Sequence, residues 1–177
     1  MITSKRINSS EAEAFKPLWD LYEDAFPTDE RRPLSYQVEA MQYEQYHFEA
    51  LYDAETLIGF VAWWQTASHI YIEHFATFPH LRNKGYGSLF LKQFSKSHSS
   101  PILLEVEAPE DDLTKRRIAF YERIGFVHNE HPYAHPSYHG AAPVQLKIMT
   151  YPHAITAEEL DEFKQKGFPL IHFRYRK

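Results

Sequence analysis

Seven consecutive residues have the side chains and spacing most suited to binding a charged ligand: Arg82-Asn83-Lys84-Gly85-Tyr86-Gly87-Ser88. The two glycines let the backbone come close to a ligand and adopt positive φ angles. An amphipathic stretch over residues 89–94 follows and predicts a helix, whose first amides are unpaired and whose dipole favours an anion. With Arg82 and Lys84 as countercharges, the segment is predicted to bind a pyrophosphate group, mostly through main-chain N–H groups.

A Gly-x-Gly pair alone is weak evidence, because many turns carry it for structural reasons only. Here a preceding apolar strand over residues 70–77, Pro79 and the following helix all favour the binding interpretation. The loop differs from the phosphate loop of nucleotide triphosphatases, which ends in Gly-Lys-Ser/Thr. It also differs from the Gly-x-Gly-x-x-Gly of dinucleotide-binding folds, because Phe90 occupies the third glycine position.

The composition restricts the class of protein. With 177 residues, 44% of them hydrophobic and 24% charged, the chain is expected to form one domain, or one domain with a short extension. A net charge of −5 and the absence of a long Lys/Arg run argue against nucleic acid as a partner. The lack of cysteine excludes disulfides, thiolate metal sites and a cysteine nucleophile.

Membrane and metal partners are not expected either. The N-terminus carries no apolar signal core, and no apolar run approaches the ~20 residues that cross a bilayer, so we expect a soluble, cytoplasmic protein. His131, His135 and His139 have a spacing of four that invites a metal hypothesis. Pro132 and Pro136 break helix geometry there and no carboxylate completes a ligand set, so no metal is expected.

Alternating and helical periods of apolar residues outline the elements that must position the glycine loop. The predicted strands cover residues 47–52, 57–65, 70–77, 101–106, 144–149 and a stretch from Phe126 onward, with a further one at 170–175. The predicted helices cover residues 10–26, 33–41, 89–94, 115–124 and 156–167. With a first strand at the N-terminus, this order predicts a mixed sheet with helices packed on it.

Capping residues and glycines predict where helices end. The capping boxes are Ser10 with Glu13 and Thr156 with Glu159. Thr114 is predicted to cap the helix over residues 115–124, which Gly125 closes. Residues 131–143, rich in Pro, His and Tyr, are expected to form a loop, and Gly167 is expected to end the last helix.

Two stretches resemble a known family. Residues 75–87, Phe-Ala-Thr-Phe-Pro-His-Leu-Arg-Asn-Lys-Gly-Tyr-Gly, look like the acetyl-CoA-binding motif of the GNAT superfamily of N-acetyltransferases. Residues 119–126, Ala-Phe-Tyr-Glu-Arg-Ile-Gly-Phe, resemble the second signature of that superfamily, and one helix and one strand separate the two stretches, as in the family. In element order the resemblance covers about residues 1–151.

The resemblance implies a fold and a division of the chain. The fold would be α/β (α+β), a mixed and largely antiparallel sheet of about seven strands with flanking helices and a splayed central strand pair. Residues 1–151 would form the acetyltransferase domain. Residues 152–177 would form a C-terminal helix and strand extension, packed on that domain or on a partner in a homodimer.

The resemblance also implies the reaction, with acetyl-CoA as a co-substrate and no metal. An acetyl group would pass directly to a primary amine, with Tyr121 protonating the leaving thiolate. A backbone N–H of the strand carrying Phe75 and Thr77 would serve as the oxyanion donor. Many relatives carry Asn at the position of Thr114 and a small residue at that of Arg117. The expected cofactor-binding residues are Phe75, Ala76, Thr77, Arg82, Asn83, Lys84, Gly85, Tyr86, Gly87, Ser88, Thr114 and Arg117.

Two candidates remain for the base that takes the amine proton: a carboxylate and a chain of water molecules. Glu73 lies two residues before Phe75 and shares its sheet face unless a bulge intervenes, with His74 on the other face. Glu105 and Glu107 can approach from the adjacent strand. Glu73 is the catalytic carboxylate that we expect beside Tyr121.

The acceptor pocket is expected between residues 26–32 and residues 133–138, and acidic side chains near the cleft favour a small cationic amine. The expected acceptor-binding residues are Phe26, Glu30, Arg31, Tyr71, Tyr133 and Tyr138. Two rival interpretations stay open. One is a non-catalytic acyl-CoA-binding sensor with the same fold, and the other is a different nucleotide-binding α/β protein.

Overall fold

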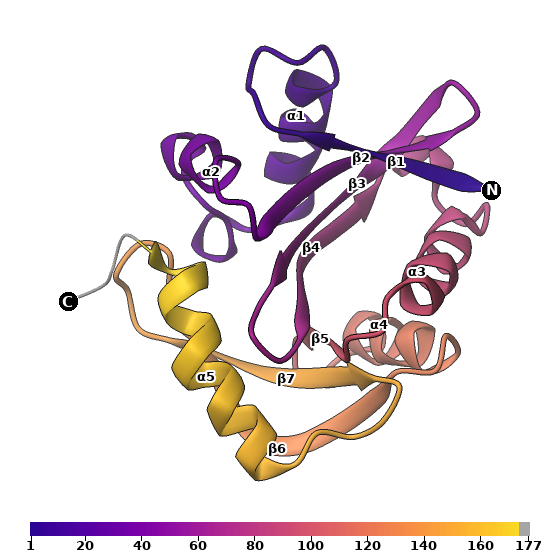
Figure 1. The fold of residues 1–177 in the computed structure, drawn as a ribbon. Helices are drawn as coiled ribbons and strands as arrows, with labels where there is room; N and C mark the ends of the chain where they lie inside the picture. The colour runs from indigo at the N-terminus through magenta and orange to yellow at the C-terminus, as the bar shows by residue number, and fades with distance from the viewer. Residues whose placement is uncertain (174–177) are drawn as a thin grey trace.

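A seven-stranded sheet organises the chain, whose computed structural model describes residues 1–173 (Figure 1). The strands are β1 (Ile2–Ile7), β2 (Tyr46–Asp53), β3 (Thr56–Gln65), β4 (Ile70–Thr77), β5 (Ile102–Val106), β6 (Val127–His135) and β7 (Val144–Tyr151). Their order across the sheet is β1-β2-β3-β4-β5-β7-β6, and every pair is antiparallel except β4–β5. The predicted mixed, largely antiparallel sheet is confirmed.

Helices cover both faces of the sheet. They are α1 (Phe15–Ala25), α2 (Leu34–Ala40), α3 (Tyr86–Ser97), α4 (Asp112–Glu122) and α5 (Ala157–Ile171). Figure 1 shows α1, α2 and α5 on one side of the sheet and α3 and α4 on the other. Each side buries its own apolar cluster, one containing Leu18, Tyr22 and Phe163 and the other Phe90, Leu91 and Ile118. No helix within residues 1–173 is long and apolar enough to cross a bilayer.

The parallel pair β4–β5 separates part-way along its length. Ile70, Tyr71 and Ile72 pair with residues 102–104, and beyond them β4 continues to Thr77 and β5 to Val106 without further pairing to each other. The predicted splay of the central strand pair is therefore confirmed. It opens the sheet at its middle, between the two covered faces.

A bulge in β4 lies next to this opening. Ala62 of β3 pairs with His74 while the next residue, Trp63, pairs with Ile72, so Glu73 is an extra residue in β4. An extra residue reverses the alternation of side chains beyond it.

The bulge places Glu73 and His74 on the same face. The Glu73 carboxylate accepts a hydrogen bond from Trp64, and the His74 ring packs on Tyr22, both within the α1 side of the sheet. Phe75 stacks on Phe90 of α3, on the opposite side. Glu73 was predicted to share a face with Phe75 unless a bulge intervened; the bulge is present, so Glu73 lies on the face of His74 and opposite Phe75.

Two helices begin at residues other than those predicted. Helix α1 begins at Phe15 rather than Ser10, since Pro17 lacks an N–H and fits only the first helical turn. Helix α4 begins at Asp112, because Asp111 rather than Thr114 is its N-cap. Thr114 is the third helical residue, and its hydroxyl completes a capping box with Asp111.

The C-terminal part also differs from the prediction. Strand β6 extends to His135, so residues 131–135 are strand and the loop is limited to 136–143. The Thr156–Glu159 capping box is confirmed, but α5 continues through Gly167 to Ile171. A Cβ at Gly167 would lie 3.2 Å from the Phe163 ring, so this glycine allows close packing and does not end the helix. The strand predicted at 170–175 is wrong for residues 170–173, which are helix and turn, and residues 174 and 175 lie outside the described part of the chain.

Candidate active site

A cavity of about 800 Å³ occupies the opening between β4 and β5 and is lined from both sides of the sheet. Of the predicted site residues, the cavity is lined by Phe26, Glu30, Tyr71, Glu73, Phe75, Ala76, Thr77, Arg82, Asn83, Gly85, Tyr86, Gly87, Ser88, Arg117, Tyr121 and Tyr138. Lys84, Thr114, Arg31 and Tyr133 do not line it. Two ligands approaching from opposite faces of the sheet could meet in this space.

The glycine loop supplies an uncapped helix N-terminus to the cavity. Asn83 has φ 62° and Gly85, the N-cap of α3, has φ 83°, so the chain turns sharply into the helix. No side chain caps this N-terminus, and its first turn carries no acidic residue. The first amides of α3 are therefore available to an anion, which the helix dipole also favours.

The end of β4 is held close to β3 by a glycine. A Cβ at Gly59 would lie 2.1 Å from the Ala76 carbonyl oxygen, so a side chain cannot be accommodated without moving β4. Gly59 pairs with Thr77, and the Phe78 amide donates to the Ile58 carbonyl at 3.0 Å. These contacts fix the residues 75–77 that line the cavity.

Tyr121 brings a neutral phenol to the cavity from α4. Its half-buried ring packs on Phe120 and Phe126 at centroid distances of 5.2 and 5.7 Å. Burial raises the pKa of Tyr121 to about 12, with Arg117 acting in the opposite direction. Its hydroxyl, which is protonated at neutral pH and makes no hydrogen bond to the described residues 1–173, can donate a proton to a bound group.

Glu73 is engaged in a buried ion pair and is not a free carboxylate. Its Oε2 lies 2.5 Å from Arg32 Nη1, and the two side chains are 1% and 2% exposed. Trp64 Nε1 donates to Oε2 at 3.2 Å, and the Tyr138 hydroxyl donates to Oε1. Burial alone would raise the pKa of Glu73, but the charges of Arg32 and His74 and the hydrogen bonds from Tyr138 and Arg32 together lower it below its ordinary value of 4.5. A carboxylate neutralised in this way is a poor proton acceptor.

Arg32 lies in the predicted acceptor segment 26–32 but was not among the expected acceptor-binding residues. The prediction named Arg31 instead, which pairs with Glu23 at 3.2 Å outside the cavity. Arg32 Nη2 donates to the Ile171 carbonyl at 2.8 Å, and its guanidinium lies 4.8 Å from the centre of the Tyr138 ring. Two adjacent arginines have the same local pattern, so only the tertiary structure distinguishes the buried one.

A second buried carboxylate, Glu105, lies on β5. Its Oε2 accepts a hydrogen bond from Tyr71 at 2.9 Å, and its Oε1 accepts one from Tyr133. His135 Nδ1 lies 2.8 Å from Oε1, and His172 Nε2 lies 3.1 Å from His135 Nε2. Tyr133 is thus a hydrogen-bond donor to Glu105 and does not line the cavity. His172 was not predicted, and His135 was considered only as a metal ligand and as part of the segment 133–138. Their pairing with Glu105 depends on β6 continuing past Pro132 and on α5 reaching Ile171.

Carboxylates gather at the α1 side of the cavity. The lining includes Asp24, Asp29, Glu30, Glu105 and Glu107. Burial raises the pKa of Glu30, and the nearby Glu107 and Asp29 carboxylates raise it further. Arg117 forms an ion pair with Glu107. This end of the cavity therefore suits a cation.

Two histidines hold the 28–31 segment at the rim of the cavity. His74 Nε2 donates to the Glu30 carbonyl at 2.9 Å, and His139 Nε2 lies 2.7 Å from the Thr28 carbonyl. Burial lowers the pKa of His74 to about 4, so this imidazole is neutral at physiological pH. Within residues 1–173 no three His, Asp or Glu side chains are grouped to hold a metal ion.

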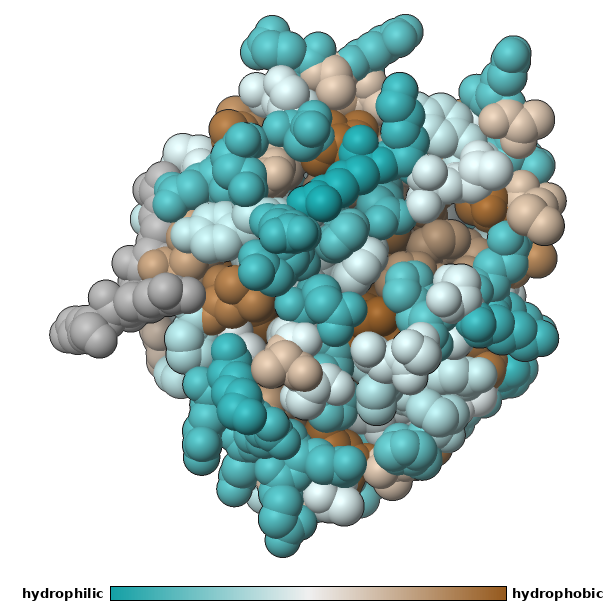
Figure 2. All heavy atoms as spheres, in the orientation of Figure 1, coloured by the Kyte–Doolittle hydropathy of each residue, from teal (hydrophilic) through white to brown (hydrophobic). Residues whose placement is uncertain are grey.

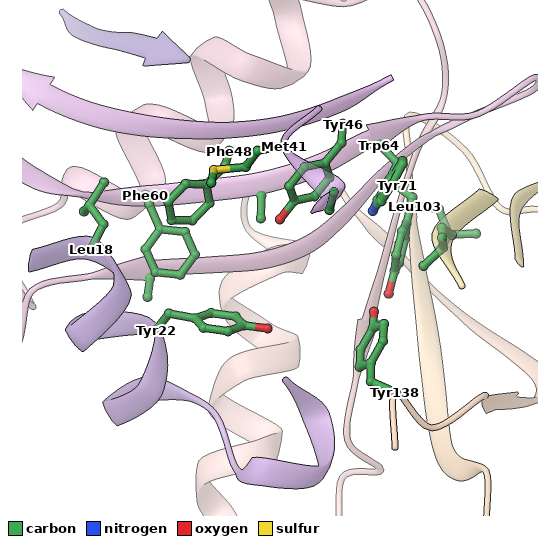
Figure 3. Packing of buried hydrophobic residues seen from close by; sticks show 14 of the residues in the cluster. Leu18, Tyr22, Met41, Tyr46, Phe48, Phe60, Trp64, Tyr71, Leu103 and Tyr138 are labelled. Atoms are coloured by element: carbon green, nitrogen blue, oxygen red, sulfur yellow. The ribbon is translucent and has the colours of Figure 1, made fainter. Parts of the chain in front are cut away.

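Figure 3 shows the packing on the α1 side of the sheet. The hydroxyl groups of Tyr71 and Tyr138 point toward one another, and Tyr22 lies beneath Phe60. Tyr71, Phe60 and Trp64 are fully or almost fully buried. Tyr71, which lines the cavity, thus belongs to a layer of buried aromatic rings.

Comparison with known proteins was made on sequence and on structure. The acetyltransferase (GNAT) family model matches residues 15–126. The structure is similar to that of a putative GNAT acetyltransferase from Bacteroides thetaiotaomicron, with 31% identity, TM-score 0.89, and coverage of 96% of this chain and 98% of that one. No curated protein sequence matches the chain significantly.

Two more distant structures share the fold. The ribosomal-protein-S18-alanine N-acetyltransferase from Escherichia coli has 21% identity and TM-score 0.58, with coverage of 89% of this chain and 97% of that one. NAA60 from Arabidopsis thaliana, solved in complex with acetyl-CoA, has 18% identity and TM-score 0.59, with coverage of 85% and 99%.

Proposed function

The chain belongs to the GNAT family of acetyl-CoA-dependent N-acetyltransferases, and we propose that it transfers the acetyl group directly to a primary amine of a small cationic acceptor. The observation that supports this most is the cavity through the sheet. One end meets the uncapped N-terminus of α3, and the other is lined by carboxylates. The first suits a pyrophosphate and the second an ammonium group.

Different residues of the cavity would bind the cofactor, stabilise the oxyanion and protonate the leaving group. The amides of residues 85–88 would bind the pyrophosphate of acetyl-CoA, with Arg82 as a countercharge. A main-chain N–H of residues 75–77 would stabilise the oxyanion that forms when the amine attacks the thioester carbon. Tyr121 would give its hydroxyl proton to the sulfur as the carbon–sulfur bond breaks.

The acceptor class follows from charge. Besides Glu73, which is paired with Arg32, five carboxylates line the acceptor end of the cavity, and Arg117 is paired with one of them. An acceptor with a second positive charge therefore gains attraction that a neutral amine lacks. For unit charges 8 Å apart at an effective dielectric of 20, this attraction amounts to about 2 kcal/mol, and screening leaves roughly a tenfold preference.

A matched series of amines tests the acceptor class. Cadaverine, pentylamine and 5-aminopentanoate share one primary amine and differ in the charge at the far end. We expect kcat/KM for acetyl transfer to fall in that order, by roughly tenfold at each step. Glu30→Gln should reduce the differences in kcat/KM between the three amines. Asp20→Asn, which removes an exposed carboxylate on α1 that is paired with Lys16 and does not line the cavity, should leave them unchanged.

The same assays separate the rival interpretations. Binding of acetyl-CoA, seen as an increase in melting temperature, with no transfer to any amine would indicate a non-catalytic acyl-CoA sensor. A larger increase with ATP or NAD than with CoA would indicate another nucleotide-binding protein. An equal rate with all three amines would refute the cationic acceptor but not the acetyltransferase.

The predicted homodimer stays a prediction. Figure 2 shows a mostly hydrophilic face, on which hydrophobic residues appear as small separated areas. Helix α5 packs on the apolar cluster that contains Leu18 and Phe60 through Phe163 and Ile171. Sedimentation equilibrium of the full chain measures the oligomeric state directly.

A further inference from the structure

Glu105 lies where the sheet opens. Leu104, the residue before it, is the last residue of β5 that pairs with β4, and the Glu105 carboxylate lines the cavity. Its side chain is 11% exposed. Glu73, the other buried carboxylate of the cavity, is neutralised by Arg32, and Glu107 is paired with Arg117. In the described part of the chain, Glu105 has no Lys or Arg partner within ion-pair distance.

The hydrogen bonds of Glu105 leave one lone-pair site of its carboxylate that can accept a proton. A carboxylate has about four lone-pair sites, two on each oxygen. Tyr133 and His135 occupy those of Oε1, while Tyr71 occupies one of those on Oε2. The second site on Oε2 is the one that a substrate N–H can reach.

The hydrogen-bond partners of the two histidines determine where their protons lie. His172 Nδ1 is buried without a hydrogen-bond partner among residues 1–173, and a buried N–H without an acceptor is rare in proteins. His172 therefore carries its proton on Nε2 and donates it to His135 Nε2. His135 in turn carries its proton on Nδ1 and donates it to Glu105. In this state both imidazoles are neutral and Glu105 is a carboxylate.

We propose that Glu105 is the general base of the acetyl transfer, and that His135 and His172 are positioning residues that hold its carboxylate in place. The proposal deepens the N-acetyltransferase function proposed above and rests on it. It also assigns a role to His172, the C-cap of α5. This residue lies outside the residues 15–126 that the family model matches.

The neutral amine attacks the thioester carbon, the nitrogen–carbon bond forms, and the carbonyl π pair moves to oxygen. As the nitrogen gains positive charge, its N–H bond becomes acidic enough for a carboxylate to accept the proton at Glu105 Oε2. The carbon–sulfur bond then breaks, its electron pair goes to sulfur, and Tyr121 supplies the proton for the thiol. Solvent returns the proton from Glu105 to the Tyr121 phenolate, which restores both groups.

Protonation of His135 opposes this step. Burial alone would lower the pKa of His135, but the Glu105 carboxylate and its hydrogen bond raise it above the ordinary value of 6.5. Glu73 also raises it and Arg32 lowers it. Within the described residues, the groups that face the His135 ring are these three charged groups and the neutral rings of Tyr71, Tyr138, Phe168 and His172. Since a protonated His135 neutralises Glu105, activity should fall as the pH drops through the pKa of His135.

The test measures kcat as a function of pH with saturating acetyl-CoA and one fixed amine. The ionisation of the amine is then common to all variants. Glu105→Gln should lower kcat by roughly 10² to 10⁴-fold, with the dissociation constant of acetyl-CoA within about twofold of the wild-type value. His135→Asn keeps an N–H donor toward Glu105 but cannot titrate, so the acidic limb of its profile should move to lower pH.

A matched pair at residue 172 tests the positioning role. His172→Gln retains an N–H donor toward His135 and should keep most of kcat, whereas His172→Phe retains a ring against Tyr138 and should lose at least about tenfold. Melting temperatures and acetyl-CoA affinities show that each variant is folded.

Two results would overturn the proposal: an unchanged acidic limb in His135→Asn, or a kcat of Glu105→Gln within about threefold of wild type. If Glu105→Gln does not fold, the pH profile of His135→Asn decides alone. Failure of the proposed function is distinguishable, because the wild-type protein would then acetylate no amine before any variant is compared.

Discussion

Replacing Glu73 by Gln tests whether this carboxylate stabilises the fold or takes part in catalysis. The change keeps the shape of the side chain but leaves the Arg32 guanidinium, 2% exposed, without its carboxylate. Breaking a buried pair by removing one partner costs about 3–5 kcal/mol, because the remaining charge stays desolvated. For a chain of this length each kcal/mol shifts the melting temperature by about 2–4 °C, so we expect a decrease of about 6–20 °C.

Urea denaturation followed by circular dichroism measures the free energy of unfolding directly. A double variant, Arg32→Met with Glu73→Leu, removes both charges and should recover most of the loss, because the desolvation cost disappears together with the attraction. Asp20→Asn breaks the exposed pair with Lys16 and serves as the control, with an expected cost below about 0.5 kcal/mol.

The pH dependence gives an independent check. The folded-state pKa of Glu73 lies below 4.5, so its contribution to stability is present above pH 4.5 and is lost as the pH falls through the folded-state value. The Gln variant should lack this part of the acid sensitivity. A cost below about 1 kcal/mol, combined with a loss of the acidic limb of kcat, would refute the structural role and make Glu73 the base.

Three further changes have defined outcomes. Tyr121→Phe should lower kcat by roughly 10² to 10⁴-fold with the calorimetric acetyl-CoA affinity unchanged, and an unaltered kcat would exclude Tyr121 as the acid. Gly59→Ala places a Cβ 2.1 Å from the Ala76 oxygen, so thermal melts should show lower stability and a smaller shift with acetyl-CoA; a wild-type melt would contradict the packing argument. The pKa of His74 is lowered to about 4, so unfolding takes up a proton and stability should fall by at most about 3 kcal/mol between pH 6.5 and 4. His74→Gln should flatten that decline in urea titrations, and an equal slope would contradict it.

Much of the fold follows from local pattern. Strand β4 has the predicted bounds because its apolar run ends at Pro79, and the glycine loop and α3 follow from Gly85 and Gly87 with the amphipathic stretch after them. Such signals depend on residues close in sequence. They suffice for the order of elements and for the splayed pair that the family resemblance implied.

The acceptor side was harder to predict because distant residues create it. The orientation of Glu73 depends on a bulge opposite Ala62 and Trp63, which no residue of β4 signals. The partners of Arg32 and His135 come from α5, at the far end of the chain. Whether an arginine or histidine is buried there depends on tertiary contacts, which the periodicity of a single segment does not contain.

The bond between Arg32 and the Ile171 carbonyl has a consequence for synthesis of the protein, because 139 residues separate the two. At about 5–20 residues per second, a ribosome adds Ile171 about 7–28 s after Arg32. Glu73 follows Arg32 by only 41 residues, so the ion pair can form well before α5 exists. The nascent chain is therefore expected to complete the glycine loop and α3 first. It completes the wall around Tyr138 and His135 only after residues 171 and 172 have been added.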